Sequence, residues 1–174
     1  MPNSIETTGI DELFSEMRRQ YGSGASIAAC VRMSTTEPEN IPKKDSKTTD
    51  RLLADRTPGK NMMILNILAK AKRRFDFVDD STKNVILDSW YAAVDKYLSK
   101  DSGALISGAK RVAELLVIGF RDHFRRGEAK DGQPKPLDPK YKAIKKNIFG
   151  KELPIGVSTG RTKNSFTTSV EIIR

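Results

Sequence analysis

The chain has few of the residues that build disulfides, metal centres and nucleophilic active sites. Its 174 residues include one cysteine, Cys30, and one histidine, His123. A single cysteine excludes an intrachain disulfide and a multi-cysteine zinc site, and a single histidine excludes a multi-histidine metal site. We interpret Cys30 as a small packed residue, with a reactive thiol as the less favoured alternative, and His123 as a residue that helps to satisfy carbonyls at a helix end. A reducing compartment is therefore expected.

Long apolar segments and nucleotide-binding glycine patterns are also missing. No apolar run approaches the roughly 20 residues needed to cross a bilayer, and the longest, Leu115–Phe120, has charge on both sides. Residues 1–9 contain no basic segment followed by an apolar one, so we expect no signal peptide. Neither a phosphate-loop spacing nor a dinucleotide fingerprint occurs, and Asp79-Asp80 is interpreted as a helix cap. We expect no enzyme, no cofactor, no metal site and no membrane partner.

Positive charge is abundant and is concentrated in one segment. The net charge is +9, from 31 basic and 22 acidic residues, and the segment 121–151 alone has ten basic and four acidic residues. Such a cluster favours an anionic partner, either nucleic acid or the acidic face of another subunit. The candidate binding residues are Lys140, Lys142, Lys145 and Lys146. The alternative interpretation is a solvated helix face that keeps the protein soluble.

Hydrophobic spacing predicts an α+β fold, with about five helices packed on a small, mostly antiparallel sheet. The expected helices cover residues 10–21, 61–75, 80–98, 104–126 and 139–149, and a short helix also fits residues 49–55. Strands are expected near 25–33 and 165–173, because apolar residues alternate in both segments, and we predict that they lie close together. Gly108 and Gly119 lie inside an expected helix and weaken it, which predicts the close approach of another backbone in compensation.

The helix that should follow Asp138 has a clear start. Aspartate is a preferred cap, and proline is favoured at the first helical position, which Pro139 would occupy. The spacing of Tyr141, Ile144 and Ile148 predicts that these three side chains face inward and the four lysines outward.

We expect a single domain, residues 1–174, with a long extended arm at about 34–60. The arm contains three prolines and no hydrophobic period. Loops of this length in compact domains are usually functional or flexible. We therefore expect the arm to become ordered only against neighbours in an assembly.

The C-terminal third contains an ordered motif. A Pro-Leu-x-Pro-x-Tyr stretch followed by a lysine precedes a Val-x-Thr-Gly segment and a Ser-Phe pair that opens the final strand. The residues concerned are Pro136, Leu137, Pro139, Tyr141, Lys145, Val157, Thr159, Gly160, Ser165 and Phe166. In this order they resemble the neck and tail-completion proteins of long-tailed bacteriophages, over about the last 55 residues. Thr162 stands where the family usually has leucine, so the packing of this turn on the sheet is expected to differ from that in the family.

The resemblance implies a structural role without catalysis. Members of this family join the head connector to the tail, so the chain would act as a ring of identical subunits with hexameric or related symmetry. It would be made in the host cytoplasm and reside in the neck or tail of the virion. Its partners would be itself, the neighbouring connector and the tail-tube or terminator proteins, with DNA in the lumen as a further contact. The alternative is a small basic nucleic-acid-binding protein, which the residues 121–151 suggest by charge alone.

Overall fold

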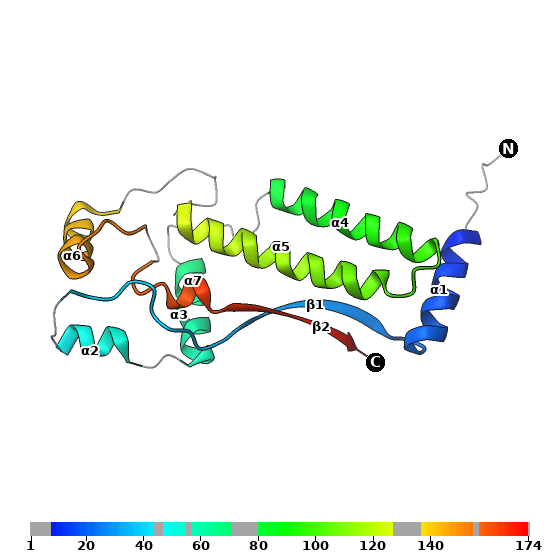
Figure 1. Ribbon diagram of the computed structural model, residues 1–174, viewed down its shortest axis with the longest axis horizontal. Coiled ribbons are helices and arrows are strands. Elements are labelled where there is room, and N and C mark those ends of the chain that lie inside the picture. The colour runs from blue at the N-terminus through cyan, green and yellow to red at the C-terminus, as the bar shows by residue number, and fades with distance from the viewer. Residues whose placement is uncertain are drawn as a thin grey trace.

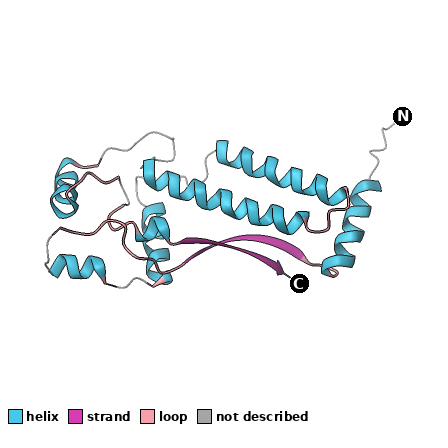
Figure 2. Cartoon of the chain, in the orientation of Figure 1, coloured by secondary structure: helices cyan, strands magenta, loops and turns pink. Residues whose placement is uncertain are grey.

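Two antiparallel helices, α4 (Asp80–Leu98) and α5 (Ala104–Arg126), run along the long axis of the molecule (Figure 1). The computed structural model describes residues 8–43, 47–54, 57–70, 80–126, 137–154 and 157–173. A two-stranded ribbon packs against α5, so the centre has three layers: α4, α5 and the ribbon. Figure 2 shows how little of the described chain is strand, with the two strands side by side below the helices. None of the described helices is long and apolar enough to span a bilayer.

The ribbon joins two segments from opposite ends of the sequence. Strand β1 (Ser26–Met33) pairs with β2 (Phe166–Ile173) in antiparallel register along its whole length. The register places Ile27 opposite Ile172, so the apolar faces of the two strands coincide and pack toward the helices. The predicted strands, their proximity and the α+β fold class are confirmed.

The apolar core forms two clusters along the ribbon. One lies where α1 (Thr8–Tyr21) meets the turn between α4 and α5, and its buried members are Tyr21, Tyr97, Ala104 and Leu105. The other lies at the opposite end of α5 and contains Val117, Phe124, Val157 and Phe166. The ring of Phe166 lies 5.1 Å from that of Phe120 and 6.1 Å from that of Phe124, centroid to centroid. The start of β2 is thereby fixed on α5.

Gly108 lets the two long helices approach each other closely. A Cβ atom at this position would lie 2.3 Å from the Cβ of Ala93, far inside van der Waals contact. The predicted close approach at Gly108 is confirmed, and it offsets the cost of about 1 kcal/mol that glycine has in a helix relative to alanine.

The remaining helices gather at the other end of the molecule. They are α2 (Lys47–Leu53), α3 (Pro58–Lys70), α6 (Pro139–Phe149) and the single-turn α7 (Arg161–Asn164). Together with α1, α4 and α5 they make seven helices in the described residues, where about five were expected. Helix α3 begins three residues before its predicted start, at a proline, which favours a first helical position. Its predicted C-terminal end, 71–75, lies outside the described residues.

Three large apolar side chains of α1 and α4, on or beside the apolar stripes of these helices, are exposed. Phe14 is 51% exposed, Leu87 47% and Leu98 50%. Helix α4 packs mainly on α5, and at its C-terminal end Tyr97 also meets α1, so among the described residues the side of α4 that faces away from α5 is largely uncovered. The hydrophobic period predicted the helices correctly but overestimated the width of their buried faces.

Candidate interaction site

The Val-x-Thr-Gly motif folds into a buried turn immediately before β2. Gly160 has a φ of +78°, in the left-handed region that glycine adopts without penalty, and it precedes the single turn of α7. Thr159 is 2% exposed and Ser165 is fully buried. The Ser165 hydroxyl donates to the Thr162 carbonyl at 2.9 Å, which closes the turn. The motif residues Val157, Thr159, Gly160, Ser165 and Phe166 are all buried.

The segment after β1 runs along this turn (Figure 1). The Ser34 amide donates to the Ser165 carbonyl at 2.7 Å, and the Glu39 amide donates to the Thr159 carbonyl at 2.7 Å. Residues 34–43 are therefore held within the subunit. The expectation that the whole arm orders only in an assembly is wrong for this segment, since its backbone bonds to its own C-terminal turn. Further along, residues 47–53 and 58–60 are helical.

Glu39 links the arm to α7 through charge as well as through its backbone. Its Oε2 lies 2.6 Å from the Lys163 Nζ and accepts a hydrogen bond from the Asn164 Nδ2 at 3.0 Å. These contacts, with Lys163 as the largest cause, lower the pKa of the Glu39 carboxyl. A Cβ on Gly160 would lie only 2.8 Å from the Glu39 Cβ. The arm can therefore pack this closely at Glu39 only because residue 160 is a glycine without a side chain.

Arg161 attaches a third segment to the turn, and sequence analysis missed it. The residue is 3% exposed. Its guanidinium donates to the Leu53 carbonyl at 2.9 Å and also to the Ala54 carbonyl. These carbonyls end α2, so Arg161 caps that helix with a positive charge, as the helix dipole favours. The sequence shows two basic residues close together, Arg161 and Lys163, and nothing in it distinguishes the buried one from the other.

Lys145 ties α6 to the same turn from the other side. It is 3% exposed, and its Nζ donates to the Pro154 carbonyl at 2.6 Å and to the Val157 carbonyl at 2.5 Å. Burial lowers the pKa of the ammonium from 10.5 to about 8. The prediction that Lys145 lies outside with the other lysines is wrong. Its ammonium is used to satisfy two loop carbonyls and is not available to an external anion.

The orientation of α6 differs from the predicted one. Lys145 and Phe149 are buried, whereas Tyr141 is 47% exposed and Ile144 51% exposed. The prediction that Tyr141 and Ile144 face inward is therefore wrong, and Ile148 is half-buried. The helix rotates its lysine toward the turn because the carbonyls there need donors. Two apolar side chains are left in contact with solvent.

The other three candidate lysines remain at the surface. Lys142 is paired with Glu152 at 2.9 Å between Nζ and Oε2, while Lys140 and Lys146 are exposed. Asp138 accepts from the Lys140 amide at 2.9 Å, so the capping carboxylate already occupies the positive end of α6. The predicted cap and the proline start of α6 are confirmed.

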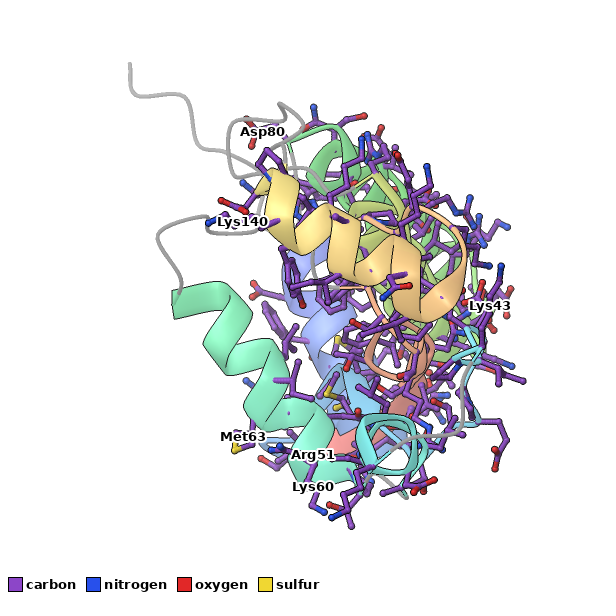
Figure 3. All side chains as sticks on the ribbon, turned by 90° about the vertical axis from the view of Figure 1, so that its left-hand side faces the viewer. Lys43, Arg51, Lys60, Met63, Asp80 and Lys140 are labelled. Carbon is purple, nitrogen blue, oxygen red and sulfur yellow. The ribbon has the colours of Figure 1, made fainter. Side chains whose placement is uncertain are left out.

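Figure 3 looks at this end of the molecule. The labelled basic residues are Lys43 of the arm, Arg51 of α2, Lys60 of α3 and Lys140 of α6, and Lys43 and Lys140 lie on opposite sides of this end. An extended partner surface fits this arrangement better than a small anion. Of the remaining motif residues, Leu137 is half-buried, Pro139 opens α6, and Pro136 lies outside the described residues.

Within the described ranges there is no group of three or more His, Cys, Asp or Glu residues that could hold a metal ion. No family model, curated protein or solved structure matches the chain. The C-terminal turn is the best-defined interaction centre of the protein. The segments 34–43 and 47–54, more than a hundred residues earlier in the chain, and the nearby α6 are fixed on it.

Proposed function

We propose that the protein is a structural virion component of a tailed phage: a neck or tail-completion protein that joins the head connector to the tail as a ring of identical subunits. The observation that carries this proposal is the C-terminal turn. Five of the residues that carry the family resemblance are buried there in one unit, and a sixth, Lys145, donates to its carbonyls. That unit fixes the arm, α2, α6 and the start of β2.

The surface supports a role in assembly. The exposed large apolar side chains include Phe14, Met62, Met63, Leu87, Tyr91, Ile118, Tyr141 and Ile144. They lie on five different helices, and the pairs Leu87–Tyr91 and Tyr141–Ile144 are each close enough along a helix to form part of a contact surface. Within the described residues β1 and β2 pair only with each other. Each strand therefore has one open edge, and an open edge can accept a strand from another chain.

The alternative, a small nucleic-acid-binding protein, has less support. Lys145 is internal and Lys142 is paired. The remaining basic residues are spread around one end of the molecule (Figure 3). A contact with DNA in a lumen agrees with this spread as a secondary property of a ring.

Particles made without the protein test the proposal. Electron microscopy should show full heads and full-length tails that are separate, and the wild-type chain supplied in trans should restore joined virions. Normal virions in its absence would refute the proposal. Purified protein that binds duplex DNA tightly, with an affinity that falls steeply as salt rises, and that never associates with particles would favour the alternative.

A further inference from the structure

Helix α6 carries an apolar row that its own subunit does not cover. Tyr141 and Ile144 are about half exposed, and Ile148 continues the row one turn later. Positions i, i+3 and i+7 are those by which an amphipathic helix anchors in a groove. The adjacent side of α6 is held in the subunit through Lys145 and Phe149, and the Lys145 Nζ lies 5.2 Å from the centroid of the Tyr141 ring, so the helix cannot turn to bury this row within the subunit.

A groove lies at the other end of the molecule, between α1 and the last turn of α4. Its volume is about 770 Å³, within the range of about 300–1,000 Å³ typical of ligand sites. It is lined by Tyr97 and Leu98 of α4 and by Asp11, Glu12, Ser15 and Glu16 of α1. Leu98 is 50% exposed, so the groove has an apolar surface open to a partner.

The charges of the two surfaces are complementary. Glu16 is neutralised by Arg19, at 2.5 Å between carboxylate and guanidinium. Asp11 and Glu12 are exposed and make no ion pair with any residue that the structure describes. With Glu16 they make three carboxylates in the lining against two cations, Arg19 and Lys100, so the groove has a net charge of −1. Beside the apolar row of α6, Lys140 is exposed and likewise unpaired among the described residues.

We propose that the apolar row of α6 in one copy of this chain seats in the α1–α4 groove of the next copy, with Lys140 near Asp11 and Glu12. The two surfaces lie at opposite ends of the molecule (Figure 1). The contact is therefore heterologous, so each copy uses its row on one neighbour and its groove on another, and the arrangement closes into a ring when the rotation allows. The inference rests on the ring of identical subunits proposed above and names the contact that builds it.

Two variants of the full chain test the contact, one for each surface. Ile144→Glu places a charge in the row, and Leu98→Glu places one in the groove. In sedimentation velocity at tens of micromolar the wild type should form oligomers, and each variant alone should be a monomer. An equimolar mixture should form one-to-one dimers and stop there, because only one intact row and one intact groove remain to meet.

Matched controls separate this contact from a general effect of charge. Ala143→Glu changes an exposed residue on another side of α6, and Val85→Glu changes a half-exposed residue at the far end of α4. Both should form oligomers as the wild type does. Circular dichroism should show the wild-type helical content in all four variants. Lys140→Glu should weaken self-association about threefold, and adding Asp11→Lys in the same chain should restore it.

A wild type that stays monomeric would overturn the contact, as would variants that associate normally or a mixture that does not pair. Particle assembly distinguishes this failure from failure of the proposed function. If heads and tails stay apart without the protein but are joined by the Ile144→Glu chain, the function stands and the contact is wrong. If virions form normally without the protein while the mixture still makes dimers, the contact stands and the function is wrong.

Discussion

Gly160 and Gly24 provide a matched pair for measuring the packing of the arm on the C-terminal turn. Both have a φ of +78°, but a Cβ on Gly24 would meet nothing within 4 Å, whereas a Cβ on Gly160 would lie 2.8 Å from the Glu39 Cβ. Left-handed backbone costs a residue with a side chain about 1–2 kcal/mol, and overpacking adds about 1–3 kcal/mol. Gly24→Ala should therefore cost about 1–2 kcal/mol and Gly160→Ala about 2–5 kcal/mol.

Urea unfolding followed by the fluorescence of Trp90, the single tryptophan, measures both costs. With a denaturant slope of about 2 kcal/mol/M, an excess of 2 kcal/mol would lower the midpoint of Gly160→Ala by about 1 M below that of Gly24→Ala. The arm cannot easily withdraw from the new methyl group, because the Glu39 amide is bonded to the Thr159 carbonyl. Equal midpoints for the two variants would refute the close approach of arm and turn.

Two further predictions concern the buried cations of the same turn. Between about pH 8 and 10.5 the Lys145 ammonium keeps its proton in the unfolded chain but has released it in the folded chain. The free energy of unfolding of the wild type should therefore rise by up to about 1.4 kcal/mol per pH unit relative to that of Lys145→Met. Below pH 8 this group should contribute no pH dependence. Parallel stability curves for the two proteins from pH 7 to 10, measured by urea unfolding, would contradict this. Arg161→Met should cost about 2–4 kcal/mol, because two hydrogen bonds from a buried charged donor to the end of α2 are lost. Hydrogen exchange should then show α2 amides losing protection while α5 keeps it, and unchanged α2 protection would exclude the capping role.

The central layers could be predicted from the sequence because their signals are local and repeated. The bounds of α5 were obtained from one apolar period, which Asp101 and Gly103 interrupt on one side and the loop after Arg126 ends on the other. The two strands were found from alternation alone. Only their proximity was predicted, and the structure adds the antiparallel pairing and its register.

The orientation of α6 could not be predicted in this way. Its period marks Tyr141 and Ile144 as the inner face, and an isolated amphipathic helix would bury them. The decisive interaction is instead between Lys145 and two carbonyls of the following loop. Leaving those carbonyls without donors costs more than exposing two apolar side chains that are already half covered. The spacing of apolar residues within a helix contains no information about backbone carbonyls outside that helix that require a hydrogen-bond donor.

Arg161 was missed for a related reason. Its partners, the carbonyls of Leu53 and Ala54, are more than a hundred residues away in the chain. The sequence shows a basic residue beside a turn glycine, which is usually a solvated position. Only the fold brings the end of α2 to that place.

The pairing of β1 with β2 has a consequence for the timing of synthesis. About 130 residues separate Met33 from Phe166, so at 5–20 residues per second β1 is made roughly 10 s before its partner exists. The α4–α5 hairpin, built from local contacts, folds far sooner. Helix α6 is anchored only when the carbonyls of Pro154 and Val157 have been made. The C-terminal turn can therefore form only when translation is nearly complete, and the segments that are fixed on it reach their final places at that late stage.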